Sequence, residues 1–498
     1  MDLFPVPTMP KHFLEPRRLP GATPESTEAL RKVLRENHEK WHAIFHDLGF
    51  HNHVAHHVIA IWALGASAES VQEAYDAELH MQRPIAHGVT ADMVPITESN
   101  FSEHLGEQRY YQNYLAFFDE KIASLGPAEV IAKFILSPAY NTSQSDMLNR
   151  YHAGLIHGFI HAGYGLEFGL PGMVSEGLAM TAATPPDPAG DIISSFTTTS
   201  QDSSFISQAL SSLSLAPPKP ATPVQTPHAL SFLSRIDAGP TLTMERTPFM
   251  GAEFYAKHGW KVKAFARKWI GSAAHGLDGG ALQKLLEKKV EELAWMNVVI
   301  YAAGGLNAED NKDFKADFFS MHLVTSSTFL SSHIAHLHPQ ASLTLLQAYF
   351  SSVVFWYIVR RGGTSIDLAT FYRNTDTFLQ TNPSFNAKIS PSTQGQGPAS
   401  AWTAITESGL TREDEHYPKI QRALLHYSVL YGTKTFADET FPGDSLKVFE
   451  KLDGTLFFRA AAATEKRTGP DVVVKGAGYG DTNAFWDGRP GNEEHAGH

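Results

Sequence analysis

The chain contains no cysteine among its 498 residues. This absence excludes disulfides, thiolate metal sites, iron–sulfur clusters and cysteine nucleophiles. Any metal bound by this chain must therefore be held by histidine, aspartate, glutamate or a group derived from lysine.

Positively charged residues are also fewer than negatively charged ones. The chain has 40 lysines and arginines against 52 aspartates and glutamates, so its formal net charge is −12. No basic cluster stands out, and phosphate binding needs a positive footprint. We therefore expect no nucleic-acid partner. An acidic surface suits a small, neutral or weakly acidic ligand.

Long apolar runs are missing, because no stretch of about 18 residues is uninterrupted by polar side chains. The best candidate, residues 345–359, contains Gln347, Ser351 and Ser352 and is typical of a buried helix. The first 20 residues are rich in proline and do not resemble a secretory signal. We expect no membrane partner and a cytoplasmic location.

Strand patterns are scarce, and apolar residues recur mostly at helical spacing. The sequence therefore predicts an all-α fold, a single multi-helix body with an internal metal-containing pocket. The only expected strands form one small hairpin near Phe457 or at residues 472–474. Helices are predicted at residues 27–47, 52–66, 68–80, 107–125, 127–136, 151–168, 251–269, 280–303, 312–331, 342–361, 365–377 and 414–432.

Composition divides the chain into four parts. Residues 184–227 are rich in proline, serine, threonine and alanine, which indicates a low-complexity insertion or surface loop. It separates an N-terminal helical half, residues 1–183, from a C-terminal half, residues 228–469. Residues 470–498 form a tail.

Histidine is the unusual residue: the chain has 25, arranged in clusters. The first cluster, HNHVAHH at residues 51–57, opens a predicted helix. With about 100° per residue, His57 lies at the rim of the apolar face, His53 further round, and His56 points away. We favour His57 as a metal ligand. The alternative is that all three are polar residues on the surface.

The second cluster contains His157 and His161 in a glycine-rich helix. The i and i+4 spacing places both imidazoles on one face, as when one helix supplies two ligands to one metal. Gly154, Gly158 and Gly165 each weaken a helix by up to about 1 kcal/mol relative to alanine, which indicates close approach of another element or a ligand. The alternative is two core histidines bonded to carbonyl oxygens.

Two further segments carry candidate residues. His322 lies in an apolar helix. Four roles stay open for it: a metal ligand, an orienting group, a substrate contact, or a core histidine whose hydrogen bonds are satisfied. His416 and Lys419 are three apart at the start of a helix, and His426 continues their stripe. A buried lysine tends to be neutral and can take up carbon dioxide as a carbamate; the alternative is a snorkelling lysine. The nearby His333, His336 and His338 are expected in a loop or on the surface.

Three of these segments resemble the questin oxidase-like family of mostly fungal enzymes. They are HxxHH at residues 53–57 followed by ALGA, HGFIH at 157–161 followed by GYGLEF, and DEHYPK at 414–419 followed by RALL. The blocks occur in the family's order. Such enzymes act in aromatic polyketide biosynthesis and open anthraquinone-type rings oxidatively, with a Baeyer–Villiger-like outcome.

The resemblance implies a non-haem iron oxygenase whose Fe(II) is held by four histidines and a carboxylated lysine. Carried onto this sequence, the metal ligands are His57, His157, His161, His416 and the carbamate of Lys419. His322 is the reserve for the fourth histidine. NADPH is implied as an external reductant, although no dinucleotide-binding motif is present.

Other residues receive supporting roles as hypotheses. His426, Arg422 and His322 are catalytic candidates that orient the carbamate or bind a phenolate. Four aromatic residues are candidates for lining a flat substrate pocket: Trp62, Tyr164, Phe318 and Tyr427. Two other classes stay open from the sequence, a helical metal-dependent hydrolase and a non-catalytic helical binding protein whose histidines are structural.

Overall fold

The computed structural model describes residues 1–46, 49–188, 226–238, 251–270, 279–304, 316–361, 365–381, 398–436 and 449–468, with a few isolated positions besides. Within these ranges all regular elements are helical, and β-structure is limited to isolated bridges such as Trp41 with Pro84. The all-α prediction is therefore confirmed. Most of residues 184–227, and the whole tail after residue 469, lie outside the described residues.

One expected element is wrong. Phe457 does not belong to a hairpin, because it lies within α18 (Thr455–Thr468), where its buried ring packs 4.6 Å from that of Trp295. An apolar helix that is buried on several sides can mimic the alternation of a strand over a short window. The other proposed strand, residues 472–474, lies outside the described residues.

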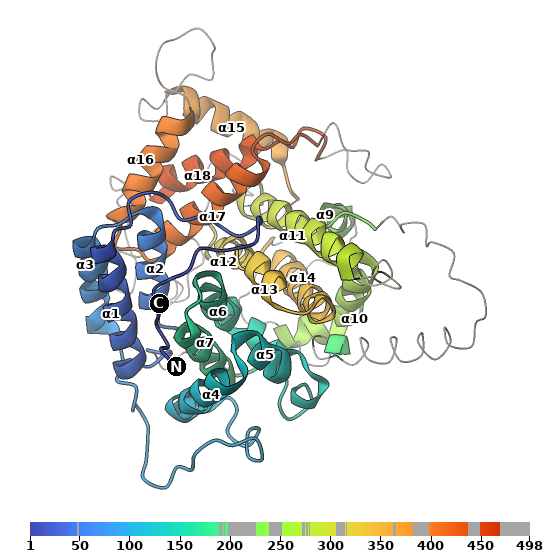
Figure 1. Cartoon of the computed structure of the whole chain (residues 1–498). Coiled ribbons are helices and arrows are strands. Elements are labelled where there is room, and N and C mark those ends of the chain that lie inside the picture. The colour runs from blue at the N-terminus through green and yellow to red at the C-terminus, as the bar shows by residue number, and fades with distance from the viewer. Residues whose placement is uncertain are drawn as a thin grey trace, which may run out of the picture.

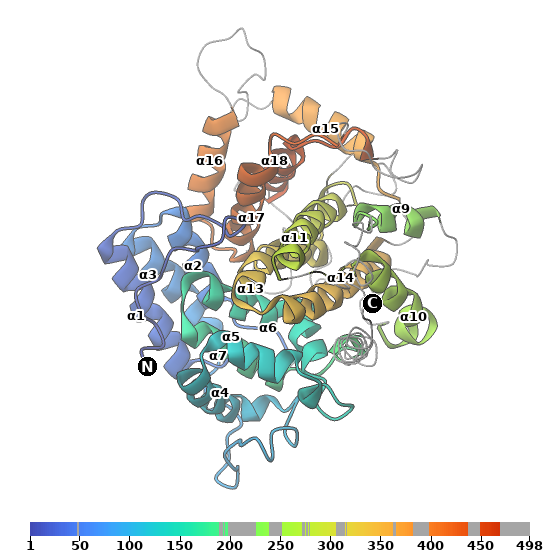
Figure 2. The ribbon, with the colours of Figure 1, turned by 45° about the vertical axis from the view of Figure 1, so that its right-hand side comes forward.

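Helices from both halves of the sequence meet at the centre of the molecule. The helix α6 (Met147–Phe168) contacts α12 (Phe318–Ser327) and α2 (Val54–Leu64), and α17 (His416–Tyr431) contacts both α2 and α12. Figures 1 and 2 show the N-terminal and C-terminal helices on two sides of α6 and α13 (Leu330–His336). The four segments that carry the histidine clusters are thereby brought together.

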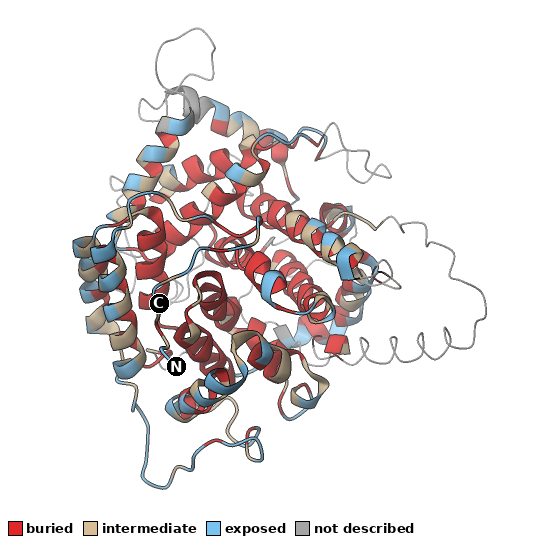
Figure 3. Cartoon of the chain, in the orientation of Figure 1, coloured by how far each residue is buried: buried red, intermediate tan, exposed pale blue. Residues whose placement is uncertain are grey.

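The remaining helices surround this centre. They are α1 (Pro24–Lys40), α3 (Ala68–Glu78), α4 (Tyr111–Leu125), α5 (Pro127–Ile131), α7 (Pro171–Ala183), α9 (Leu230–Ala238), α10 (Gly251–Trp269), α11 (Gly279–Ala302), α14 (Pro339–Arg361), α15 (Leu368–Thr381) and α16 (Pro398–Leu410). Burial is greatest along the central helices, whereas α1, α3 and α10 expose one face (Figure 3).

The helix α14 is long and apolar. Its stretch Pro339–Arg360 is long and apolar enough to cross a membrane, and 89% of its most apolar window is buried inside the protein. A helix that is hydrophobic on all sides is expected in the core of a large protein. Residues 345–359 thus form a buried helix, as the interrupted apolar pattern predicts.

Glycines allow α6 and α7 to pack closely. A Cβ on Gly158 would lie 2.2 Å from Thr181 Oγ1, and a Cβ on Gly177 would lie 2.6 Å from the backbone nitrogen of Ala162. Side-chain atoms do not fit at such distances. The close approach that the glycines of this segment predict is confirmed at Gly158, and it fixes α7 against the histidine-bearing helix.

The helical course of α6 is interrupted just before His157. Gly154, Leu155 and Ile156 have φ angles of 55°, 58° and 68°, in the left-handed region. For a residue with a Cβ this conformation costs about 1–2 kcal/mol, and such costs are concentrated at functional sites. The break gives His157 a position at the start of a helical run rather than within one.

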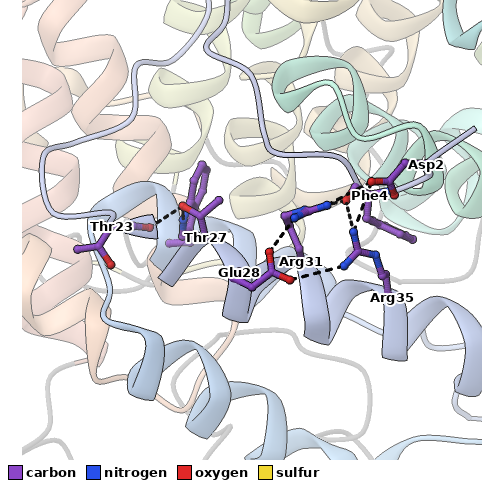
Figure 4. Close-up of polar contacts among 8 residues, drawn as sticks. Asp2, Phe4, Thr23, Thr27, Glu28, Arg31 and Arg35 are labelled. Atoms are coloured by element: carbon purple, nitrogen blue, oxygen red, sulfur yellow. Dashed lines mark hydrogen bonds and ion pairs between the residues drawn. The ribbon is translucent and has the colours of Figure 1, made fainter. Parts of the chain in front are cut away.

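The N-terminal segment is tied to α1 by charged side chains. Arg31 and Arg35 both reach Asp2 and donate to the carbonyl oxygen of Phe4 at 3.0 Å (Figure 4). Thr23 caps α1 in a reciprocal pair of hydrogen bonds with Ser26. The helix starts earlier than expected because Thr23 accepts the backbone N–H of Ser26.

Candidate metal centre

Four imidazoles form a closed ring in the interior. Their ring centroids are 4.6 Å apart for His53 and His157, 5.0 Å for His157 and His322, 5.3 Å for His322 and His416, and 4.8 Å for His416 and His53. They come from the residue before α2, from α6, from α12 and from the first position of α17. Only tertiary packing brings these residues together.

Nitrogen atoms of three of these rings lie close together, and the fourth ring contacts one of the three. Ligand atoms of His53, His322 and His416 all lie within 4.8 Å of one another. The Nε2 atom of His157 lies 2.5 Å from Nε2 of His53. Nitrogen donors from separate elements that meet in this way have the arrangement of a metal site with imidazole ligands.

The other ring nitrogen of each histidine is held by an acceptor. Nδ1 of His53 is 3.1 Å from Glu415 Oε1, and Nδ1 of His416 is 3.2 Å from the same oxygen. Nδ1 of His322 donates to the carbonyl oxygen of Phe318 at 2.7 Å, and Nδ1 of His157 donates to that of Gly154.

An imidazole that donates from Nδ1 carries its lone pair on Nε2, the atom that would bind a metal. Outer partners of this kind orient metal-binding histidines. The three acceptors, Glu415 and the carbonyl oxygens of Phe318 and Gly154, therefore preset the tautomer and the ring orientation that a metal requires.

Burial favours the neutral form of two of these rings, His53 and His157. It lowers the pKa of His53 well below the ordinary value, and the nearby charges of Lys419 and His416 lower it further. Burial lowers the pKa of His157 in the same way, with His53 and His51 adding to the effect. Because only neutral imidazole binds a metal, these two residues are in the binding form at neutral pH.

Lys419 lies beside the ring of imidazoles. It is buried, one helical turn after His416. Its charge lowers the pKa of His53 and also that of His56. The lysine predicted from the sequence is thus close to the candidate metal centre.

Two histidines predicted as ligands, His57 and His161, are not members of the ring of four imidazoles. His57 pairs through Nδ1 with Glu78 Oε1 at 2.6 Å. Nδ1 of His161 lies 2.9 Å from Nε2 of His56, and Nε2 of His161 lies 2.6 Å from Glu176 Oε2. Of the predicted ligand histidines, His157 and His416 belong to the ring of four imidazoles, and the reserve His322 is a third member.

His53, the fourth member, was not predicted as a ligand. A helical wheel of α2 requires one apolar face, but every residue from Val54 to Leu64 is buried. His53 is the residue before the helix, where the wheel angle does not apply. The acidic pair Asp414 and Glu415 beside His416 was the available signal, since carboxylates orient metal-binding histidines.

Two of the predicted catalytic residues, Arg422 and His426, are not members of the ring of four imidazoles. Arg422 makes a buried ion pair with Glu167, and its guanidinium lies 5.8 Å from the ring of Tyr164. Burial raises the pKa of Glu167 to about 7, against the opposing charge of Arg422. His426 bonds through Nε2 to the carbonyl oxygen of Leu14 at 2.9 Å.

The aromatic candidates divide into two pairs. Phe318 packs 4.6 Å from His322 and 5.1 Å from His416, and Tyr164 stacks 5.4 Å from His56. Trp62 instead donates from its indole nitrogen to Thr27, and Tyr427 bonds with Ser327 at 2.7 Å. Phe318 therefore contacts the ring of four imidazoles and Tyr164 contacts His56, whereas Trp62 and Tyr427 have other partners.

One histidine outside this centre differs from expectation. His333 was expected in a loop or on the surface, and this is wrong, because it is fully buried in α13. Its Nε2 bonds with the hydroxyl of Tyr151 at 2.8 Å, and its ring stacks on Phe159 at 4.1 Å. These two partners from α6 satisfy the imidazole within the core.

The chain belongs to the questin oxidase-like family, whose model matches residues 50–424. This range includes all four imidazoles, Glu415 and Lys419, so the whole candidate centre lies within the family's shared region. The resemblance of the three histidine-containing motifs is thereby confirmed.

Named relatives of the chain are oxidoreductases from fungi. It is 27% identical over 439 residues to Baeyer-Villiger monooxygenase dmxR6 from Cryptosporiopsis sp., covering 85% of this chain and 86% of that protein. It is 30% identical over 315 residues to Baeyer-Villiger oxidase ptaJ from Pestalotiopsis fici, covering 61% and 63%. With questin oxidase from Aspergillus terreus it shares 32% over 157 residues, 31% and 35% of the two chains.

Proposed function

We propose that this chain is an iron-dependent oxygenase that opens a ring of an anthraquinone or a related aromatic polyketide by inserting oxygen beside a carbonyl. The observation that carries the proposal is the closed ring formed by His53, His157, His322 and His416. Ligand nitrogens of three of them, His53, His322 and His416, lie within 4.8 Å of one another. The names of the relatives, Baeyer-Villiger oxidases and questin oxidase, supply the reaction class.

The residues of the centre fit iron. Imidazole is a suitable ligand for iron, as it is for zinc and copper, and the chain has no thiolate that would favour a different metal. We propose His53, His157, His322 and His416 as the four histidine ligands, in place of a set that includes His57 and His161.

Lys419 completes the proposed ligand set as a carbamate. Four neutral imidazoles leave the two positive charges of Fe(II) unbalanced, and a carbamate would supply a negative oxygen ligand. The burial of Lys419 and the effect of its charge on His53 and His56 support this role. A lysine shifts toward the neutral form that reacts with carbon dioxide when it is desolvated.

Bound iron would supply the one-electron chemistry that dioxygen needs to react with an aromatic ring. Insertion of one oxygen atom, with release of the other as water, consumes two electrons and two protons. We propose NADPH as the diffusing source of the electrons. Among this chain's own residues, Phe318 and Tyr164 would flank a flat substrate, and Arg422 would stabilise a phenolate oxygen near Tyr164.

The test combines metal analysis with oxygen consumption. Protein purified without metal and then loaded with Fe(II) and bicarbonate should bind about one iron per chain and consume dioxygen when given a hydroxylated anthraquinone and NADPH. Zinc binding with hydrolysis and no oxygen uptake would favour a metal-dependent hydrolase. Failure to bind any metal would favour a non-catalytic protein.

Lys419→Arg tests the carbamate separately. Arginine keeps the positive charge but cannot be carboxylated, so we expect at least a 10-fold weaker iron affinity and no response to bicarbonate. Arg412→Lys is a matched control, because Arg412 pairs with Glu465 away from the imidazoles. Iron affinity and turnover that survive in Lys419→Arg would remove the carbamate from the proposal.

A further inference from the structure

The outer face of α10 concentrates positive charge in an acidic protein. The helix contains five lysines and arginines and a single glutamate, whereas the chain as a whole has a net charge of −12. Along the sequence these cations do not stand out, because apolar residues separate most of them. The helical turn gathers them on one face, and none of them is buried: Lys257, Lys261, Lys263, Arg267 and Lys268.

The inner face of α10 is occupied by packing. Tyr255 stacks on Phe355 of α14 at 4.8 Å, and Trp269 stacks on Phe350 of the same helix at 4.5 Å. Val262, between these two contacts, is buried as well. The aromatic contacts fix the rotation of α10 against α14, so the cationic face points away from the core.

Trp260 lies on the cationic face. It is 66% exposed, and no other tryptophan among the described residues is exposed. At about 100° per residue, Lys257 and Lys268 lie to one side of it, and Lys263 and Arg267 lie to the other. A single exposed apolar residue needs no explanation by itself. An indole ring flanked by cations on both sides, however, is a surface with two matched requirements, for negative charge and for apolar cover.

The positive charges of this face repel one another. Burial lowers the pKa of Lys263, and the charge of Arg267 lowers it further. Within the part of the chain that the structure describes, no carboxylate forms an ion pair with Lys257, Lys263, Arg267 or Lys268. A surface of negative charge laid against the helix would relieve this repulsion.

We propose that α10 docks on the surface of a membrane that contains anionic lipids, with Trp260 in the interfacial layer and the cations on lipid headgroups. Tryptophan is enriched at the membrane–water interface. Clusters of roughly four to eight lysines and arginines on an amphipathic helix are typical of binding to anionic lipids. An acidic protein surface would satisfy the cations, but a lipid interface supplies both the negative charge and an apolar layer for Trp260.

The negative charge elsewhere on the chain does not prevent this contact. Lys257 and Lys268 are about 17 Å apart along the helix axis, whereas charges beyond about 8 Å are largely screened at physiological salt. A membrane therefore meets the local charge of α10 rather than the net charge of the chain. Figures 1 and 2 both show α10 at the right-hand side of the molecule, with α1 at the left.

Such a contact is peripheral and needs no spanning helix. The expectation of no membrane partner rests on the lack of a long apolar run, which concerns spanning only. None of the imidazoles of the proposed oxygenase takes part in the contact, so the two can be tested independently.

Flotation of the full chain with phospholipid vesicles is the first experiment. We expect the chain to float with vesicles that contain phosphatidylserine and to stay behind with vesicles of phosphatidylcholine alone. Each cation near an anionic surface contributes roughly five-fold to partitioning. The triple variant Lys257→Gln, Arg267→Gln and Lys268→Gln should therefore partition about 100-fold more weakly, and binding of the wild type should weaken as salt is added.

A matched control removes three exposed lysines outside α10. The variant Lys11→Gln, Lys32→Gln and Lys40→Gln changes the net charge by the same amount and should partition as the wild type does. Thermal unfolding of both triple variants shows whether the fold is retained. Equal losses in the two variants, or a wild type that does not float with phosphatidylserine, would overturn the docking of α10.

Fluorescence tests the position of Trp260. Phospholipids with brominated acyl chains quench tryptophans that enter the membrane interface. We expect bound wild type to lose part of its emission and bound Trp260→Phe to lose much less, since phenylalanine keeps an apolar ring but does not contribute tryptophan emission. Equal quenching of the two proteins would overturn the insertion of this ring. Binding to polyglutamate without binding to vesicles would replace the membrane by an acidic protein partner.

Discussion

Nε2 of His53 lies 2.5 Å from Nε2 of His157, although 104 residues separate them in the sequence. Burial lowers the pKa of both imidazoles, so neither carries the positive charge that would repel the other. His322 and His416 complete the ring around the same point. Two buried nitrogens at this distance can share one hydrogen, and under the proposed function they are two of the nitrogens that a metal ion would hold.

The choice of ligands can be tested by comparing two histidines of the same segment. His53→Gln should lose more than 10-fold in iron affinity, because it removes a nitrogen from the ring of four imidazoles. His57→Gln should retain stoichiometric iron, because His57 is not a member of the ring of four imidazoles, although its Nδ1 also meets a carboxylate, Glu78, at 2.6 Å. Iron content measured by elemental analysis after dialysis against a weak chelator distinguishes them, and loss of iron in both variants alike would contradict this ligand set.

Glu415 should matter for the metal although it belongs to no proposed ligand set. One of its oxygens contacts Nδ1 of both His53 and His416. Replacing such an outer partner typically costs 10–100-fold in metal affinity. We therefore expect Glu415→Gln to weaken iron binding by about that factor in a competition titration. The control Glu413→Gln alters an exposed carboxylate two residues away and should bind iron normally.

Packing between α6 and α7 predicts a stability defect away from the metal. A Cβ on Gly158 would lie 2.2 Å from Thr181 Oγ1 and 3.2 Å from the carbonyl oxygen of Gly177. Overpacking of this kind costs about 1–3 kcal/mol, so Gly158→Ala should lower the free energy of unfolding by that amount in urea.

Two variants check the cause of that defect. Gly279→Ala, where no atom lies within 4 Å of the added Cβ, should be neutral or slightly stabilising. Adding Thr181→Ala to Gly158→Ala should restore part of the loss, because it removes the hydroxyl oxygen that clashes. A double variant no more stable than Gly158→Ala alone would show that this clash is not the cause.

The dependence of stability on pH should report the charge of His38. Burial would lower its pKa, but hydrogen bonds and charges from Asp119 and Glu176 outweigh burial and raise the pKa from 6.5 to about 10. A raised pKa means that the stabilisation is complete below about pH 6.5 and is lost as the pH rises toward 10.

The measurement is a comparison of wild type with His38→Gln by urea unfolding between pH 6 and 9.5. The difference in unfolding free energy should be largest at pH 6 and shrink as the pH rises, by at most about 1.4 kcal/mol per pH unit for one proton. A difference that does not change over this range would mean that His38 is uncharged in the folded protein.

Several elements follow directly from the sequence. The helical spacing of residues 251–269 predicts α10 with its observed bounds, Gly251–Trp269. Ser67, of a residue type that favours the cap position, accepts the backbone N–H of Ser70 at the start of α3. Local periodicity and capping chemistry depend on neighbouring residues, so they can be read without knowledge of the fold.

Four helices were missed, α7, α9, α16 and α18, and most of α13 was expected as a loop. The residues of α7, from Gly172 to Ala183, are all buried, so the sequence there shows no polar face from which a helical period could be recognised. Pro171 at its first turn was the available signal. The omission also hid Glu176, the carboxylate of α7 that lies between His161 and His38.

The sequence by itself determined the helical class, the reliance on histidine in a chain without cysteine, and the presence of Lys419 one turn after His416. Which histidines meet was decided only by the tertiary structure. His53 lies outside the regular part of α2, and His157 follows a left-handed break in α6. The directions of both side chains depend on backbone angles and on packing between distant helices, which the residue spacing does not encode.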